Sequence, residues 1–203
     1  MKSFMEKKKP TAGIILAAGM STRFGRLKQV QAIDGKPLLE WAIDACLGSN
    51  LERIFLVLGF RRQEILRVLA SKIRHPRLDV IFNAHYRNGQ STSLHAGINA
   101  VKDSFPSAMF VLGDQPLIDA PTLDFLLERF WSSRKSICAP FFNNKRGNPV
   151  IFSNEYYTEI AGIEGDVGAR RIIEDNPSQV LSVPLRRRSF FYDVDTQEDV
   201  KNI

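Results

Sequence analysis

The residues best suited to chemistry lie in a glycine-containing loop near the N-terminus, between Gly13 and Lys28. Gly19 and Gly25 permit backbone conformations and close approaches that a Cβ would prevent. A loop with exposed backbone N–H groups binds phosphate oxygens well. Arg23 and Lys28 add positive charge, since a guanidinium can bind two oxygens at once and an ammonium acts as a point charge. This combination indicates a binding site for the phosphates of a nucleoside triphosphate.

Two other phosphate-binding patterns are absent from the sequence. There is no Gly-x-x-x-x-Gly-Lys-Ser/Thr element, which excludes the usual phosphate loop of kinases and ATPases. There is also no Gly-x-Gly-x-x-Gly, which disfavours a dinucleotide-dependent redox enzyme. Small residues at Ala17 and Ala18 leave room for a ligand against the main chain. Considered alone, the loop could still be an ordinary turn from a strand to a helix.

Aspartates supply a second chemical feature. Asp114 directly follows the apolar stretch that ends at Gly113, and Mg²⁺ prefers one or two carboxylates together with water and substrate phosphates. Asp193 and Asp195 alternate along the chain, so they point to the same side if this piece is extended. One of them could approach Asp114 and share a metal ion. The alternative is that they are turn or helix-cap aspartates.

Strands and helices alternate in the elements that must position these residues. Short apolar runs predict strands, and apolar residues at helical spacing predict helices. Because strand and helix recur in turn, we expect right-handed βαβ units and an α/β fold with a mostly parallel sheet. The apolar strands indicate that helices cover both faces. The predicted strands are Gly13–Ala17, Arg53–Leu58, Leu78–Phe82, Ala108–Leu112, Ile137–Phe142, Gly147–Phe152 and Val180–Pro184. The predicted helices are Pro37–Leu47, Gln63–Ile73, Ser91–Val101, Pro121–Trp131, Tyr156–Ile160 and Ala169–Glu174.

Length and composition fit one globular unit. The chain has 203 residues, of which 44% are hydrophobic and 25% charged. We expect a basic N-terminal tail over residues 1–10 and a single domain over residues 11–203. No apolar run approaches the roughly 20 residues that a membrane span needs, so we expect no membrane association and a cytoplasmic location. The two cysteines, Cys46 and Cys138, are expected to be buried and chemically inert.

The net charge of +6 suits an enzyme that handles phosphates. Basic triplets occur only at 7–9 and 186–188, and no basic motif is interleaved with aromatic residues. We therefore expect no nucleic-acid partner. The three histidines form no evident catalytic triad.

Together these pieces resemble the nucleotidyltransferases that act on the molybdenum cofactor, particularly the cytidylyltransferases and related accessory proteins of xanthine dehydrogenase. The resemblance runs from Gly13 almost to Asp199. It depends on several short motifs in a fixed order, closed by Asp193-Val-Asp-Thr196. The motifs are Leu16-Ala-Ala-Gly19 with Arg23, Gly25 and Lys28, then Gly89-Gln-Ser-Thr-Ser-Leu94, Gly113-Asp-Gln-Pro116, Gly147-Asn-Pro-Val150 and Gly165-Asp-Val-Gly-Ala-Arg170.

The resemblance implies a Rossmann-like nucleotidyltransferase fold and transfer of CMP from CTP to the phosphate of molybdenum-bound molybdopterin, with release of pyrophosphate. Related guanylyltransferases usually carry Leu-Ala-Gly-Gly where this chain has Leu-Ala-Ala-Gly, which is similar to the cytidylyl branch. One departure from the pattern is Val167, at a position that is often basic.

The resemblance also implies roles for individual residues. Lys28, Arg23 and Asp114 would be catalytic, and Asp114 and Asp195 would bind Mg²⁺. The nucleotide would contact Leu16, Ala17, Ala18, Gly19, Gly25, Ser91, Thr92, Ser93 and Gly113. The pterin substrate would contact Gly147, Asn148, Asp166 and Arg170.

Two alternatives remain open from the sequence. The first is a nucleotidyltransferase that uses GTP or another phosphorylated acceptor. The second is a carrier that delivers molybdenum cofactor to a xanthine-dehydrogenase-type enzyme without turnover. A pure carrier has no need for a site that binds metal and triphosphate, so Lys28, Asp114 and Asp195 together favour an enzyme.

Overall fold

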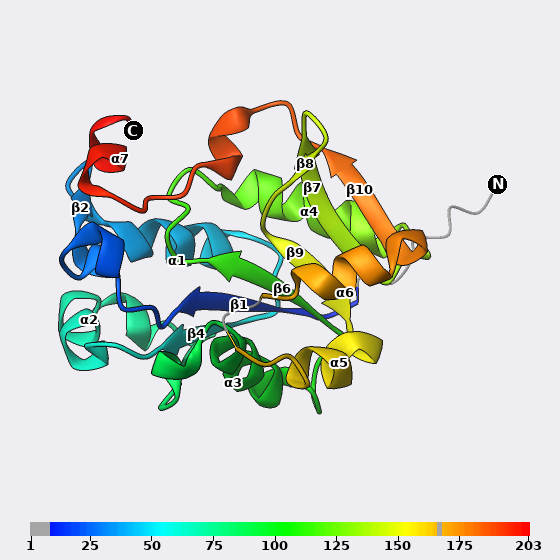
Figure 1. Cartoon of the computed structure of the whole chain (residues 1–203), viewed down its shortest axis with the longest axis horizontal. Coiled ribbons are helices and arrows are strands. Elements are labelled where there is room, and N and C mark those ends of the chain that lie inside the picture. The colour runs from blue at the N-terminus through cyan, green and yellow to red at the C-terminus, as the bar shows by residue number, and fades with distance from the viewer. Residues whose placement is uncertain (1–8, 166–167) are drawn as a thin grey trace.

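A mostly parallel sheet runs through the molecule, with helices on both faces (Figure 1). The computed structural model describes residues 9–165 and 168–203, so the expected tail lies outside the described residues except for Lys9 and Pro10. In spatial order, the strands are β10 (Val180–Pro184), β7 (Ile137–Phe142), β9 (Val150–Ser153), β6 (Ser107–Leu112), β1 (Thr11–Ala17), β4 (Arg53–Leu58) and β5 (Leu78–Phe82).

Strand β1 lies in the middle of this sheet and pairs in parallel with β4 and β6. The pairs β4–β5 and β7–β10 are parallel as well. Strand β9 runs antiparallel to both of its neighbours, β6 and β7, and the short strand β8 (Lys145–Arg146) pairs antiparallel with β7. The carboxyl ends of β1 and β6 therefore lie at the same edge of the sheet.

The core has two layers because alternate residues of β1 face opposite sides of the sheet. Ile15 packs among side chains of the helices α1 (Leu38–Gly48), α2 (Arg62–Val68) and α4 (Ala120–Trp131). Ile14 packs on the other face, among side chains of α3 (Ser91–Val101), α5 (Tyr157–Ala161) and α6 (Arg170–Asp175). This arrangement confirms the predicted α/β class with helices on both faces.

Most predicted elements are present within one to three residues of their expected bounds, but the helix expected over Gln63–Ile73 is shorter. Helix α2 ends at Val68, and a 3₁₀ turn follows at Lys72–Arg74. The ammonium of Lys72 lies 2.6 Å from Asp44 Oδ1 and 3.4 Å from Glu40 Oε1, both on α1. Tertiary contacts to α1 thus accompany the break in a sequence whose apolar spacing alone would continue the helix.

Several short elements were not predicted from the sequence. A two-stranded hairpin joins β2 (Ala32–Ile33) to β3 (Lys36–Pro37), so Pro37 ends a strand rather than beginning a helix. The last helix is α7 (Gln197–Lys201), which begins with a capping box formed by Thr196 and Asp199. The 3₁₀ turns are Thr22–Phe24, Lys28–Val30, Lys72–Arg74, Tyr86–Asn88, Asn154–Tyr156, Pro177–Gln179 and Arg188–Phe191.

Cys46 and Cys138 are both buried, as expected, and burial raises the pKa of each thiol to about 12. Within the described part of the chain, no helix combines the length and the apolar character that crossing a membrane requires.

Candidate functional site

A buried glutamine holds the loop that follows β1 in place. The side-chain amide of Gln29, which is 4% exposed, donates hydrogen bonds to the carbonyl oxygens of Ala17 (3.2 Å) and Gly19 (3.0 Å). Its carbonyl oxygen accepts from the hydroxyl of Ser21 at 3.0 Å. Ser21 and Gly25 have left-handed backbone conformations, with φ of 56° and 78°. Gln29 was not among the predicted site residues, because nothing in a single sequence marks a glutamine that holds a loop by hydrogen bonds within that loop.

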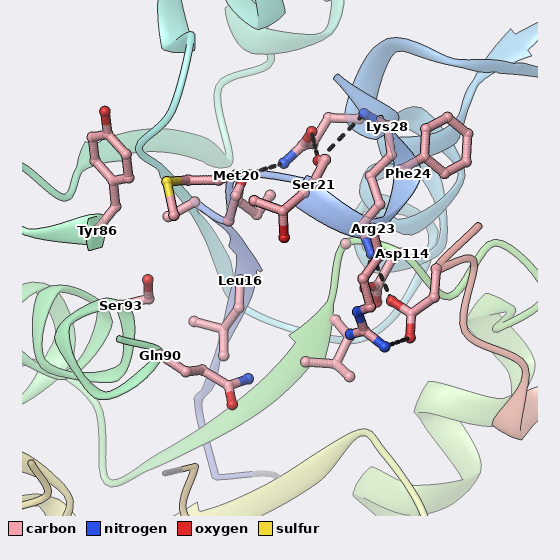
Figure 2. Close-up of a pocket in the computed structure, with 18 of the residues that line it drawn as sticks. Leu16, Met20, Ser21, Arg23, Phe24, Lys28, Tyr86, Gln90, Ser93 and Asp114 are labelled. Atoms are coloured by element: carbon pink, nitrogen blue, oxygen red, sulfur yellow. Dashed lines mark hydrogen bonds and ion pairs between the residues drawn. The ribbon is translucent and has the colours of Figure 1, made fainter. Parts of the chain in front are cut away.

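Lys28 is at the centre of a charged cluster. Its ammonium lies 2.7 Å from Asp114 Oδ2, 3.2 Å from Asp195 Oδ1 and 2.9 Å from the carbonyl oxygen of Val194. The second oxygen of Asp195 accepts from Arg23 Nη1 at 2.9 Å. Figure 2 shows Lys28, Arg23 and Asp114 close together on one side of a pocket. The structure thus brings together the four charged residues that were predicted for catalysis and metal binding.

Three separate segments supply this cluster. Lys28 and Arg23 come from the loop after β1, Asp114 follows β6, and Asp195 lies in the segment before α7. The backbone N–H of Val194 donates to the carbonyl oxygen of Asp114 at 3.0 Å. The side chain of Val194 is fully buried in a small apolar cluster with Phe24, Ile33 and Leu38. Apolar packing therefore holds the C-terminal segment against the loop.

Asp193 takes a different partner from Asp195. It accepts a hydrogen bond of 2.7 Å from the side-chain amide of Gln115, which is 3% exposed. Burial raises the pKa of Asp193, and the nearby charge of Asp114 adds to the effect. Of the two alternating aspartates, only Asp195 contacts Lys28 and Arg23.

A cavity of about 700 Å³ opens beside the charged cluster. Figure 2 shows Tyr86, Gln90 and Ser93 on the side opposite the charges, with Leu16 and Met20 between. The loop and the ends of β1 and β6 form much of its wall. Among the predicted nucleotide contacts, those that line the cavity are Leu16, Ala17, Ala18, Gly19, Ser93 and Gly113.

Three other predicted nucleotide contacts do not line this cavity. Gly25 ends the 3₁₀ turn of the loop. Ser91 is buried at the start of α3. Thr92 accepts a hydrogen bond of 2.8 Å from the side-chain amide of Asn83, which also donates to Ser93 at 3.0 Å. The structure therefore does not place Gly25, Ser91 or Thr92 in the lining of this cavity.

A second, smaller cavity of about 240 Å³ adjoins the first, and Leu16, Gln90 and Leu112 line both. Asn148 and Arg170, predicted to contact the pterin, line the second cavity. Gly147 lines neither cavity.

A packing contact explains the glycine at position 147. A Cβ there would come within 2.1 Å of the ring of Phe191. Asp166, the remaining predicted pterin contact, lies outside the described residues.

The charged cluster has features expected of a divalent-cation site. Asp114 Oδ1 is buried and has no hydrogen-bond partner among the residues that the structure describes, while Oδ2 faces the ammonium of Lys28. A cation thus already lies between the carboxylates of Asp114 and Asp195. No group of three or more His, Cys, Asp or Glu residues in the described ranges is arranged to hold a metal. Two carboxylates with water and phosphate completing the shell are what Mg²⁺ prefers.

Comparison with solved structures supports the fold. A homologue of the Mycobacterium tuberculosis protein Rv0371c, from Mycobacterium sp. strain JC1, superposes with a TM-score of 0.80 and 25% identity, covering 95% of this chain and 93% of that one. The manganese complex of Rv0371c from Mycobacterium tuberculosis H37Rv gives a TM-score of 0.76 at 22% identity, covering 97% and 98%.

Sequence comparison gives relatives that match along nearly their whole length. A protein of Pyrococcus furiosus named "Probable molybdenum cofactor guanylyltransferase" is 29% identical over 200 residues, covering 94% of this chain and 95% of the relative. The molybdenum cofactor cytidylyltransferase of Escherichia coli K12 is 26% identical over 187 residues, covering 92% and 91%. The MobA-like NTP transferase domain matches residues 13–180. This chain therefore belongs to the family of MobA-like NTP transferases.

Proposed function

We propose that this protein transfers CMP from CTP to the phosphate of molybdenum-bound molybdopterin and releases pyrophosphate. The observation that carries the proposal is the Lys28 ammonium between Asp114 and Asp195, at the edge of a cavity of about 700 Å³. That arrangement suits a triphosphate with its metal ion, because the loop amides, Lys28 and Arg23 supply positive charge beside two carboxylates.

The chemistry follows from the charges of the two substrates. An oxygen of the acceptor phosphate forms a bond to the α-phosphorus of the nucleotide, and the bond to the bridging oxygen of the β-phosphate breaks. A phosphate nucleophile is already ionised at neutral pH, so the reaction needs no general base. Catalysis then depends on alignment and on neutralising charge on the triphosphate. In this proposal, Lys28 and Arg23 neutralise charge on the leaving pyrophosphate.

Asp114 and Asp195 are the residues that would hold Mg²⁺. The orphaned, buried Oδ1 of Asp114 and the ammonium beside Oδ2 both fit a cation at this place. When bound, the ion would offset negative charge on the triphosphate. The manganese complex of the related mycobacterial protein Rv0371c supports a divalent metal in this family.

Two observations support the choice of substrates. Relatives from Pyrococcus furiosus and Escherichia coli carry names of molybdenum cofactor nucleotidyltransferases, which supports molybdopterin as acceptor. The sequence Leu16-Ala-Ala-Gly19 supports CTP as donor, and all four of its residues line the cavity. The guanylyltransferase relative makes GTP the second candidate donor. The product would serve a molybdoenzyme of the xanthine dehydrogenase type.

Pyrophosphate release tests this proposal. Purified protein is incubated with Mg²⁺, molybdenum-loaded molybdopterin and CTP, GTP or ATP in parallel, with reactions lacking the acceptor as controls. We expect acceptor-dependent release that is fastest with CTP. Release that is fastest with GTP would contradict the donor assignment only. No release with any triphosphate, despite tight pterin binding, would favour a carrier. Neither release nor pterin binding would contradict the acceptor and call for screening other phosphorylated compounds.

A further inference from the structure

The second cavity contains a cation to which neither the sequence nor the comparisons gave a role. Arg146 lies in β8, whose backbone pairs with β7 through Phe141, and its side chain lines the cavity next to Asn148. The side chain is half-buried, and it forms no ion pair or hydrogen bond with any described residue. Burial lowers the pKa of Arg146, and the charge of Arg170 lowers it further.

The carboxylate of Glu174 acts on Arg146 through its charge but forms no ion pair with it, since it pairs with Arg170. A half-buried guanidinium with so little compensation is costly unless a ligand supplies further negative charge. The other cation of this cavity, Arg170, is already satisfied, because its Nε lies 2.6 Å from Glu174 Oε1 and its side chain is 74% exposed. Among the described residues that line this cavity, Arg146 is therefore the cation whose hydrogen-bond donors remain available. Its five N–H donors suit a phosphate or another multi-oxygen anion.

The remainder of the cavity is mainly apolar. Besides the polar and charged residues already named, the lining includes Leu94, Phe110, Val150, Phe152 and Ile173. Such a pocket suits a molecule with a flat, weakly polar body and a charged group. Because Leu16, Gln90 and Leu112 line both cavities, a molecule in the second cavity would lie directly against a nucleotide in the first.

We infer that the second cavity binds the acceptor and that Arg146 binds an anionic group of that acceptor. This inference rests on the proposed function, which identifies the acceptor as molybdopterin. It adds a specific contact, between Arg146 and an anionic group of the acceptor, that the proposed function does not include. Molybdopterin offers two such anionic groups, its phosphate and its dithiolate end. In either case Arg146 selects for a negatively charged acceptor. Lys28 and Arg23 bind the triphosphate instead.

Equilibrium binding tests the inference independently of turnover. The variants are Arg146→Met, which removes the charge at similar volume, and Arg146→Lys, which keeps the charge. Arg171→Met is the matched control, since that side chain is 84% exposed, pairs with Asp175 and lines neither cavity. The probes are molybdopterin, phosphatase-treated molybdopterin and CTP, each titrated into the full chain, with pterin binding followed by its fluorescence and circular dichroism used to confirm folding.

We expect Arg146→Met to weaken molybdopterin binding about 10- to 100-fold, the effect of losing a charge-assisted contact, while the affinity for CTP and the control variant stay unchanged. Arg146→Lys should recover part of the loss. If Arg146→Met has no effect on the dephosphorylated probe, the phosphate is the group bound. An equal loss with both probes would identify the dithiolate end.

Unchanged molybdopterin affinity in folded Arg146→Met would overturn the inference, and so would a loss confined to CTP. Its failure can be told apart from failure of the proposed function. Turnover with normal acceptor affinity in Arg146→Met would reject only the role of Arg146. Arg146-dependent pterin binding without turnover in the unmodified protein would reject only the transferase.

Discussion

At the scale of single residues, the ammonium of Lys28 lies where a metal ion would otherwise meet two carboxylates. Its side chain is only 15% exposed and is within 3.2 Å of oxygens from Asp114, Asp195 and Val194. In the proposed site, Lys28 would neutralise the two carboxylates when no metal is bound and would compete with a metal for the same oxygens. On triphosphate binding, the ammonium would exchange these carboxylates for phosphate oxygens.

Replacing Lys28 by methionine should therefore change metal binding and turnover in opposite directions. Without nucleotide, the affinity for Mn²⁺ should rise, because the competing charge is gone, and electron paramagnetic resonance of free Mn²⁺ would measure it. With nucleotide, kcat/KM should fall by about 10²–10³, as for loss of one transition-state donor. Weaker Mn²⁺ binding in the variant would show that the ammonium does not compete with the metal.

Asp114→Asn should lower kcat/KM by about 10²–10³ with the fold retained, because the amide cannot supply the charge that a cation needs here. Steady-state pyrophosphate release and circular dichroism measure the two effects. Asp103→Asn is the control, because Asp103 is exposed, follows the end of α3 and lines neither cavity. Activity of Asp114→Asn close to that of the control would remove Asp114 from the metal site.

A substitution at Ala18 tests whether this residue determines the preference for the base of the nucleotide, cytosine or guanine. Ala18 lines the cavity but is only 3% exposed, because it also packs in the core with Phe55 and Val57. Ala18→Gly should shift the ratio of kcat/KM for CTP over GTP towards GTP, by no more than about 10–200-fold, the range for one methylene-sized contact. An unchanged ratio would reject the steric account and point to the Tyr86–Gln90 wall instead.

At the scale of elements, the strands were the most predictable part of the fold. In β4, residues 54–58 are apolar and buried because both faces of the sheet are covered. The antiparallel insertion of β9 between β6 and β7 was not predictable, since apolar character does not reveal strand direction. The break after α2 was missed as well, because it coincides with contacts between Lys72 and α1 that local spacing does not encode.

The ion pairs of Asp44, on α1, with Lys36 and Lys72 give a prediction about how stability depends on pH. Burial alone would raise the pKa of Asp44, but hydrogen bonds from Lys36 and Lys72 outweigh it, so the pKa lies below its ordinary value of 3.8. A lowered pKa means that the ion pairs stabilise the folded state above pH 3.8 and lose this effect as the pH falls through the folded-state pKa.

Asp44→Asn should therefore lower the free energy of unfolding by about 0.2–1 kcal/mol at neutral pH. The difference from the unmodified protein should shrink in acid. Urea unfolding at several pH values measures it, with Asp103→Asn as the control. A difference that persists unchanged in acid would mean that packing, not charge, is responsible.

At the scale of the whole molecule, the site depends on a segment that returns from the far end of the chain. Asp114 and the loop could be placed from the sequence, because both directly follow strands whose carboxyl ends meet at one edge. Asp195 could only be suggested, because its approach depends on Val194 packing with Phe24 and Leu38. Arg146 was not predicted, since it lines the second cavity only when β8 folds beside α6. Gln29 was missed although its partners lie in the same loop, because the sequence does not show how that loop turns back on itself.

Gly147 connects this C-terminal return to the sheet. A Cβ at position 147 would come within 2.1 Å of Phe191, whose ring also packs against Phe142. Gly147→Ala should lower stability by about 1–3 kcal/mol, the usual effect of overpacking, and differential scanning calorimetry would show it as a lower Tm. Gly162→Ala is the control, because its Cβ would come no closer than 3.4 Å to any neighbour. Equal Tm values for the two variants would contradict the packing role.

The central claim is that this molecule attaches a nucleotide to molybdopterin, and the mass of the cofactor after reaction tests it most directly. The protein, Mg²⁺ and molybdenum-loaded molybdopterin are incubated with an equimolar mixture of CTP, GTP and ATP, and the isolated cofactor is analysed by mass spectrometry. We expect a cofactor that carries CMP as the main product, formed with one pyrophosphate per adduct. A cofactor that remains unmodified with all three triphosphates would contradict the claim.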